Sequence, residues 1–512
     1  MGLEMVICTC PGRQSGANRD RVRDSNGAAT VLSFSRALLH GDAMSDYTLI
    51  KNALCVATMD DNDRRIAGGD VLVQGNRIAA VGSNLKPPDG ADATIIDATD
   101  KVVLPGFINT HHHLYQTLTR NLPRVQDAKL FDWLIELYEV WRGLDPEAVR
   151  VGAQVGIAEL LLTGCTTTTD HFYVFPKDQP GELLDETILA ARDLGIRFHP
   201  TRGSMSRSRS KGGLPPDDVV QTEDAILEDC ERVITKWHDP DPFSMCRIAL
   251  APCSPFSVTT KLLRESAVFA RKKGVMLHTH LAETRDEDDF CVKTLGMRPL
   301  AYMESVGWLG PDVWYAHGVH FNDAELDVLA CTGTAIAHCP TSNMRLGSGI
   351  ARVPDMRDRG VTVGLAVDGS ASNDSSSFLR EMIHCMLVNR VGWGVGRMPA
   401  TEVLRLATRG GAKLLRREDA IGSIVPGKAA DIAIFDLTEV GFAGALGDPA
   451  GALLFCGTLG RAHTVLVNGE VVVRDGRLTR MNEADIRERG NATAARLLKV
   501  ATRRTGNDYL KR

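Results

Sequence analysis

Three consecutive histidines, His111, His112 and His113, follow an apolar run at residues 101–108 that predicts a buried strand interrupted at Pro105-Gly106. Side chains alternate between the two faces of an extended chain, so His111 and His113 are expected on one side and His112 on the other. Two imidazoles on one side of a strand's C-terminal end can share one divalent metal ion. For this run alone, the alternative is a set of histidines satisfied by hydrogen bonds near a core.

Later apolar runs also end in residues that bind metals or transfer protons. The predicted metal ligands of the whole chain are His111, His113, His280 and Asp368. Three imidazoles and one carboxylate suit zinc or iron and leave one position for water. A metal bound in this way lowers the pKa of that water to about neutral, which predicts a hydrolytic site.

The predicted catalytic residues are Glu283, His317 and Asp368. Glu283 lies three residues after His280, where its carboxylate can face the site without being a ligand and can carry protons. His317 ends the apolar run at residues 313–317, so it can orient the water or polarise a substrate.

Two polar residues are predicted to contact the substrate. Gln116 lies shortly after His113, and its amide can donate to one ring atom and accept from another. Arg202 ends the third predicted strand and could donate to a ring oxygen. The alternatives are a polar residue at the start of a helix for Gln116 and a structural ion pair for Arg202. The loop at residues 202–216 either covers the site or is a solvated basic loop.

Eight short apolar runs, each followed by helical or loop sequence, must position these residues. The runs end near residues 108, 170, 202, 252, 280, 317, 338 and 368. A repeated strand–helix order predicts a parallel sheet of the α/β class, and eight units predict a (β/α)8 TIM-type barrel. Reactive groups of such barrels lie at the C-terminal ends of the strands, where the predicted ligands fall.

Alternating β-branched segments precede and follow the barrel sequence, with hairpin turns at Gly75-Asn76 and Asn468-Gly469. We therefore predict a small β-sandwich domain built from both ends of the chain, with Leu453-Leu454 as part of one strand. The predicted boundaries are 1–45 for a disordered N-terminal extension, 46–105 and 420–480 for the two parts of the β-sandwich domain, 106–419 for the metal-dependent barrel and 481–512 for a C-terminal helix and tail. Residues 1–45 lack periodicity and are expected to be dispensable, with Met44 as a second candidate start.

The composition argues against a protein that binds nucleic acid or spans a membrane. A chain of 512 residues with 44% hydrophobic residues can form a large core, and a net charge of −5 gives no reason to expect nucleic acid or an anionic membrane surface. No stretch approaches the roughly 18 apolar residues of a membrane-spanning helix. The 12 cysteines lack CxxC spacing, so we expect buried thiols and a cytoplasmic, reducing location.

Several motifs together resemble the amidohydrolase superfamily, and within it the branch of deaminases with one metal ion. The motifs lie at residues 109–113, 278–283, 316–318, 367–369 and 422–431, and the resemblance covers residues 46–480. It implies one divalent metal ion, zinc or else iron. It also implies that Glu283 moves a proton from the metal water to a ring nitrogen, that Asp368 takes a second proton, and that His317 holds the water.

The resemblance also implies hydrolysis of a carbon–nitrogen bond of a cyclic amidine, with 8-oxoguanine as the expected substrate and urate and ammonia as products. The alternatives are a hydrolase that removes an alkylamine from an s-triazine of the hydroxyatrazine type, and a deaminase of guanine or another aminoheterocycle. A binuclear amide hydrolase is disfavoured because no lysine stands at residues 250–254. A non-catalytic scaffold is disfavoured because all predicted ligands are present. The expected partners are the substrate and, by analogy, further copies of the chain.

Overall fold

The computed structural model describes residues 46–456 and 460–511, and the expectation for residues 1–45 lies outside them. Eight parallel strands follow one another in sequence order from β6 to β13. They are β6 (Phe107–Asn109), β7 (Cys165–Phe172), β8 (Arg197–Ser204), β9 (Ala249–Pro252), β10 (Met276–Leu281), β11 (Val313–His317), β12 (Ala335–His338) and β13 (Val363–Leu365). The N–H of Thr110 donates to the carbonyl of Leu365 at 3.1 Å, which joins the first strand to the last. The predicted (β/α)8 barrel is confirmed.

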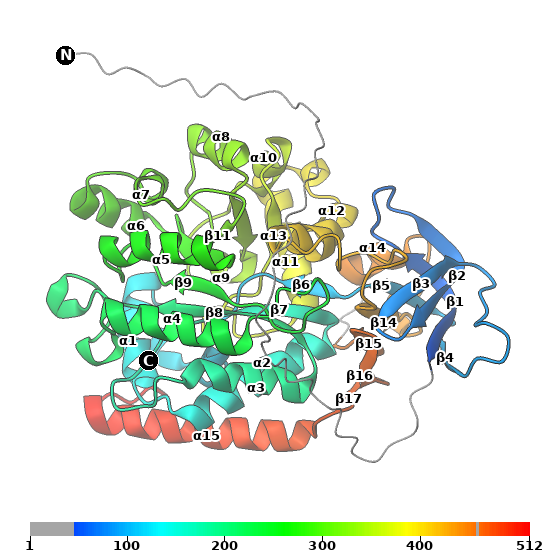
Figure 1. Ribbon diagram of the computed structural model, residues 1–512, viewed down its shortest axis with the longest axis horizontal. Helices are drawn as coiled ribbons and strands as arrows, with labels where there is room; N and C mark the ends of the chain where they lie inside the picture. Colours follow the sequence, from blue (N-terminus) through cyan, green and yellow to red (C-terminus); the bar gives the residue numbers. More distant parts are fainter. Residues whose placement is uncertain (1–45, 457–459, 512) are drawn as a thin grey trace, which may run out of the picture. The chain divides into compact units, whose positions relative to one another are not determined.

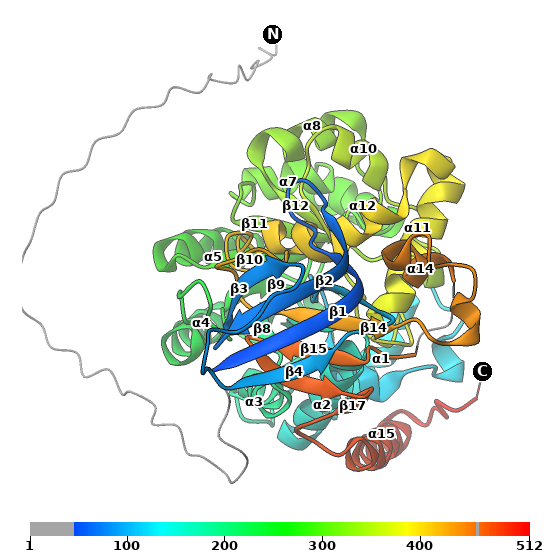
Figure 2. The same ribbon diagram turned by 90° about the vertical axis from the view of Figure 1, so that its right-hand side faces the viewer.

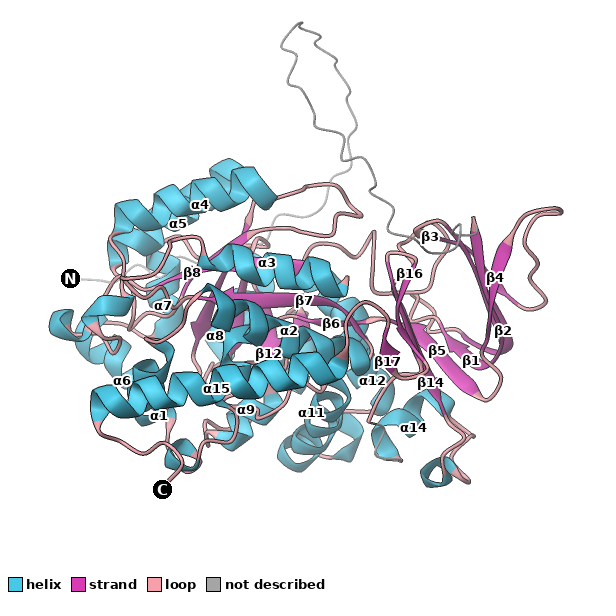
Figure 3. Cartoon of the chain, turned by 90° about the horizontal axis from the view of Figure 1, so that it is seen from below, coloured by secondary structure: helices cyan, strands magenta, loops and turns pink. Residues whose placement is uncertain are grey.

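Helices surround these strands (Figure 3). They are α1 (Leu130–Trp141), α2 (Pro146–Leu162), α3 (Leu183–Leu194), α4 (Glu223–Trp237), α5 (Thr260–Lys273), α6 (Arg285–Phe290), α7 (Pro299–Ser305), α8 (Asp323–Thr332), α9 (Pro340–Arg345), α10 (Val353–Asp358), α11 (Phe378–Trp393), α12 (Ala400–Arg405) and α13 (Gly411–Leu414). Several begin at side-chain caps, such as the capping box of Asn322 and Glu325 at α8. Because the helices cover the outside, all residues of the barrel strands are buried.

A second sheet contains strands from before and after the barrel (Figures 1 and 2). Its nine strands are β1 (Tyr47–Ala57), β2 (Arg65–Gln74), β3 (Arg77–Gly82), β4 (Ala93–Asp97), β5 (Lys101–Pro105), β14 (Ile432–Asp436), β15 (Thr464–Val467), β16 (Glu470–Arg474) and β17 (Arg477–Leu478). Strands β5 and β14 pair antiparallel, so the two ends of the chain meet directly. The predicted β unit built from both ends is confirmed, and its strands are joined by hydrogen bonds into one continuous sheet.

The prediction of a strand at Leu453-Leu454 is wrong. These residues lie in helix α14 (Pro449–Phe455). The Asp448 side chain accepts from the N–H of Gly451, and Pro449 occupies the first helical position, where its missing N–H has no cost. A start signal of this kind favours a helix over a short β segment.

Pro105-Gly106 divides the apolar run at residues 101–108 between the two sheets, because β5 ends at Pro105 and β6 begins at Phe107. A Cβ atom on Gly106 would lie only 2.1 Å from the side chain of Thr166, so a larger residue would push the chain away from β7. The Gly106 N–H also donates to the carbonyl of Asp431 at 2.9 Å. The passage of the chain from β5 to β6 at this point therefore fixes the position of the three histidines that follow β6.

The final helix, α15 (Glu483–Thr505), lies within residues 481–512, where the sequence predicts a C-terminal helix and tail. The side chain of Asn482 caps its first turn, and the helix packs along α2 and α1 (Figures 1 and 3). Among the described residues, no helix combines the length and the apolar composition that a membrane crossing requires.

Candidate metal centre

The four predicted ligands lie together where β6, β10 and β13 end. The Nε2 atoms of His113 and His280 are 3.1 Å apart. Oδ1 of Asp368 lies 3.2 Å from Nε2 of His111 and 3.4 Å from Nε2 of His113. All four side chains are buried. His112 points away, with its Nε2 2.9 Å from Oγ of Ser376, as the alternation of side chains predicts.

Backbone carbonyls hold the outer nitrogens of two of the predicted ligands, His113 and His280. Nδ1–H of His113 donates to the carbonyl of His171 at 2.7 Å, and Nδ1–H of His280 donates to that of Cys253 at 2.6 Å. A ring nitrogen beside a carbonyl carries the proton, so the inner Nε2 of each ring presents a lone pair. Burial lowers the pKa of both histidines, to about 3 for His280, which keeps them neutral.

His111 is oriented through a second histidine. Nδ1–H of His278 donates to the carbonyl of Trp314 at 2.9 Å, so its Nε2 accepts from Nδ1–H of His111 at 2.7 Å. The Nε2 lone pair of His111 then faces the other ligands and has no hydrogen-bond partner, although it is buried. Ring nitrogens that converge in this way, with that of His111 left unsatisfied, fit a divalent cation.

The link from His278 to His111 gives a prediction. In a His278→Phe variant, a flat ring still stacks on Trp314, whose ring centroid lies 4.4 Å from that of His278, but the acceptor for His111 is lost. We expect metal affinity to fall about 10–100-fold, measured by competition with a chelator. His199→Phe is the matched control because His199 also faces Trp314, at 6.0 Å, and contacts no predicted ligand. Equal affinity in both variants would remove the orienting role of His278.

The three predicted catalytic side chains face one another beside this cluster. Oε2 of Glu283 is 3.5 Å from Nε2 of His317, and Oδ2 of Asp368 is 4.0 Å from the same nitrogen. Nδ1–H of His317 donates to Oδ1 of Asn343 at 2.9 Å, which fixes the ring. Burial raises the pKa of Glu283 to about 7, where a carboxyl exchanges protons efficiently near neutral pH. Burial would also raise the pKa of Asp368, but the neighbouring imidazoles of His111 and His317 hold it well below its usual range.

The backbone turns sharply at three non-glycine residues of the site. Ala282, His317 and Asp368 have φ angles of +54°, +74° and +63°. This left-handed conformation costs roughly 1–2 kcal/mol at each non-glycine residue, and such strain gathers at functional sites. No sequence signal marked these turns.

Gln116 lines the pocket above the cluster, and its Oε1 is buried without a hydrogen-bond partner. The pocket also has walls that the sequence did not single out. They are Leu130, Trp133, Leu134, Tyr173, Cys253, Phe256, Leu346 and Ser372. Most of these side chains are apolar or aromatic, so the pocket suits a flat, partly apolar ring with few polar contacts.

Arg202 does not reach this pocket. Its guanidinium is fully buried, pairs with Asp229 of α4 and donates to Oε1 of Gln221 at 2.8 Å. It also lies 3.9 Å from the centroid of the Phe175 ring. The predicted substrate contact is therefore replaced by the structural ion pair that the sequence left as its alternative.

His171 also lies close to the predicted ligands. One of its ring nitrogens is within 4.8 Å of nitrogens of His111, His113 and His280. Its Nε2–H donates to the carbonyl of Ala251 at 2.8 Å, while Nδ1 is buried without a partner. Only the position of β7 in the folded barrel brings His171 next to the predicted ligands.

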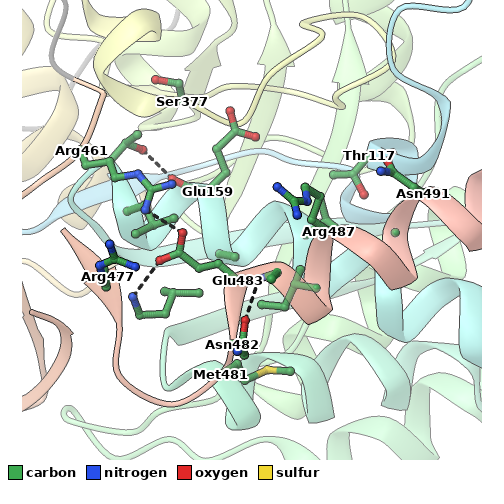
Figure 4. A pocket seen from close by; sticks show the side chains of 18 of the residues that line it. Thr117, Glu159, Ser377, Arg461, Arg477, Met481, Asn482, Glu483, Arg487 and Asn491 are labelled. Atoms are coloured by element: carbon green, nitrogen blue, oxygen red, sulfur yellow. Dashed lines mark hydrogen bonds and ion pairs between the residues drawn. The ribbon is translucent and has the colours of Figure 1, made fainter.

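A larger cavity lies between α2, α15 and β17 (Figure 4) and shares no lining residue with the pocket of the histidine cluster. Its two carboxylates are paired with arginines, Glu483 with Arg461 and Glu159 with Arg120, each at 2.6 Å. No histidine or cysteine is among the described residues that line it. The chemistry therefore points to the smaller pocket.

The chain is similar to known enzymes in sequence and in structure. The sequence matches the amidohydrolase family over residues 102–472. It is 45% identical over 451 residues to an 8-oxoguanine deaminase of Pseudomonas aeruginosa, covering 88% of this chain and 99% of that protein. It is 36% identical over 446 residues to a hydroxydechloroatrazine ethylaminohydrolase of Pseudomonas sp. strain ADP, covering 84% and 92%. The structure is similar to the zinc complex of the atrazine chlorohydrolase from Arthrobacter aurescens TC1, with a TM-score of 0.84, 35% identity and coverage of 87% and 100%.

Proposed function

The chain belongs to the amidohydrolase family, and on this premise we propose that it is a metal-dependent aminohydrolase that converts 8-oxoguanine to urate and ammonia. The observation that carries the proposal is one buried pocket in which Glu283, His317 and Asp368 face a cluster of inward lone pairs. The near full-length similarity to an 8-oxoguanine deaminase supports this substrate over others.

We assign the metal to His111, His113, His280 and Asp368, with one ion in each chain. A bound divalent metal lowers the pKa of its water to about neutral and so supplies a nucleophile. Nitrogen and carboxylate ligands suit Zn²⁺, with Fe²⁺ as the alternative. The zinc in the atrazine chlorohydrolase structure supports Zn²⁺.

Two carboxyl groups, Glu283 and Asp368, divide the proton transfers. Glu283 accepts one proton from the attacking water and passes it to a ring nitrogen of the substrate. Asp368 takes the second proton and returns it to the departing amine, which leaves as ammonia while the ring carbon gains an oxo group. His317, whose ring Asn343 holds in place, contacts the oxygen as it bonds to the ring carbon. Positioned acid–base groups contribute about 10²–10⁴-fold each.

Substrate recognition is assigned to the aromatic and aliphatic walls together with Gln116. Trp133 and Phe256 suit the faces of a bicyclic ring, and the unpaired Oε1 of Gln116 suits a ring N–H. With Arg202 held in its ion pair, Gln116 is the remaining predicted contact for the substrate's edge.

A panel of heterocycles tests this substrate. We expect kcat/KM for 8-oxoguanine to exceed that for guanine by roughly 10–100-fold, because an analogue that lacks one polar group leaves a buried partner unpaired, at about 1–3 kcal/mol. Adenine should be poorer still. Ammonia and ethylamine release by the purified protein are the measurements.

A second candidate is release of ethylamine from hydroxyatrazine. It is favoured by the similarity to the hydroxydechloroatrazine ethylaminohydrolase. Faster ethylamine release from hydroxyatrazine than ammonia release from 8-oxoguanine would establish this candidate in place of the first. A preference for adenosine-type nucleosides would contradict both.

A cytoplasmic location and self-association complete the proposal. The cysteines of the described residues are all free, which agrees with a reducing compartment. Light scattering on the purified protein would test self-association, which is proposed only by analogy with relatives.

A further inference from the structure

A buried carboxylate, Glu287, stands behind the proposed proton carrier. It lies in the short helix α6 and is 1% exposed. Its Oε1 accepts from the N–H of Ala282 at 3.0 Å, and its Oε2 accepts from the N–H of Glu283 at 2.9 Å. Both oxygens are therefore engaged by two successive backbone amides, one of which belongs to Glu283. Glu287 is not among the residues that line the pocket.

The two residues held by Glu287, Ala282 and Glu283, form the turn that points the Glu283 side chain into the site. Ala282 has a φ of +54°, a conformation that an alanine keeps only when its surroundings hold it. The opposite side of this stretch is attached to the turn after β11, because the carbonyl of Leu281 accepts from Gly318 at 3.1 Å and that of Ala282 accepts from His320 at 3.0 Å. The backbone of Glu283 is thus fixed from two sides.

We propose that Glu287 is the positioning residue for Glu283: its carboxylate binds the amides of Ala282 and Glu283 together and so sets the position of the Glu283 side chain beside His317. This inference rests on the proposed function in one respect, namely that Glu283 carries the proton.

A carboxylate is the side chain that this arrangement requires. Two parallel N–H donors need two acceptor atoms, and charged acceptors make the stronger bonds. A glutamine of the same shape offers one oxygen, and its NH2 group would meet an N–H that also donates. Burial raises the pKa of Glu287 to about 8, and the two amide bonds oppose this rise because they are made to the oxygens of the carboxylate.

A Glu287→Gln variant tests the proposal. We expect kcat to fall about 100-fold with KM within about 3-fold of the wild type, since small displacements of a catalytic group cost rate more than binding. Metal content should be unchanged. Asp288→Asn is the matched control, because Asp288 is the next residue of α6 and its carboxylate binds Arg298 at 3.0 Å instead of these amides. A normal kcat in Glu287→Gln, or an equal loss in the control, would overturn the proposal.

A double variant shows whether Glu287 acts through Glu283. If it does, adding Glu287→Gln to a Glu283→Gln protein should change kcat by less than about 3-fold, since the group to be positioned is already inactive. A loss as large as in the wild-type background would overturn the proposal, because Glu287 would then act independently of Glu283.

Hydrogen exchange gives a readout that needs no substrate. In Glu287→Gln, the amide protons of Ala282 and Glu283 should exchange faster than in the wild type and in Asp288→Asn. Unchanged exchange would overturn the positioning role. If the wild-type protein deaminates none of the heterocycles, the proposed function fails. The exchange measurement still decides whether Glu287 holds the amides of Ala282 and Glu283.

Discussion

Replacing Glu283 by glutamine is expected to lower kcat by about 10²–10⁴-fold while the fold and the metal content are retained. The amide has nearly the same shape as the carboxyl but cannot accept a proton from water and pass it to the ring. Glu283 is 4% exposed and touches His317, so no bulk water replaces its function. Ammonia release gives kcat, and elemental analysis gives the metal content.

A Glu304→Gln variant is the control for this prediction, because Glu304 lies on the exposed surface of α7. It should have the wild-type kcat. If Glu283→Gln also turned over at a near-normal rate, another group would be the proton carrier, and the role of Glu283 in the proposed mechanism would be wrong.

Replacing His280 by alanine is expected to abolish both metal binding and turnover. His280 supplies one of the three proposed imidazole ligands, and its ring is held by the carbonyl of Cys253 with its Nε2 3.1 Å from that of His113. Two imidazoles and one carboxylate hold a divalent ion far more weakly, and the vacated space admits water. Metal per chain should fall to near zero after dialysis, and ammonia release should fall below detection.

His463→Ala is the corresponding control, because His463 borders the second sheet and pairs with Asp475. It should keep both metal and activity. Retention of a full equivalent of metal by His280→Ala would show that the ion is bound elsewhere.

The barrel could be predicted because its signal is repeated. Each short apolar run is followed by helical sequence, and residues such as His280 and His317 recur at the ends of these runs. The position of the predicted ligands follows from topology alone, since the C-terminal ends of parallel strands meet at one end of a barrel. The C-terminal ends of the eight strands could therefore be placed at the same end of the barrel from the order of the strands alone.

The direction of a single side chain could not be predicted in the same way. Strand β8 continues to Ser204, so Arg202 lies inside the strand and faces Asp229 of α4 instead of the pocket. The left-handed turn at Ala282 and its support by Glu287 depend on contacts between separate elements. Neither hydrophobic periodicity nor motif spacing contains that information.

Titration of the metal-free protein with Zn²⁺, followed by ammonia release from 8-oxoguanine, tests the central claim most directly. The claim is that one ion, held by His111, His113, His280 and Asp368, makes this chain a deaminase. Activity should be absent without metal, rise in proportion to added Zn²⁺ and level off at one equivalent per chain. Full activity without metal, or a rise that continues to two equivalents, would contradict it.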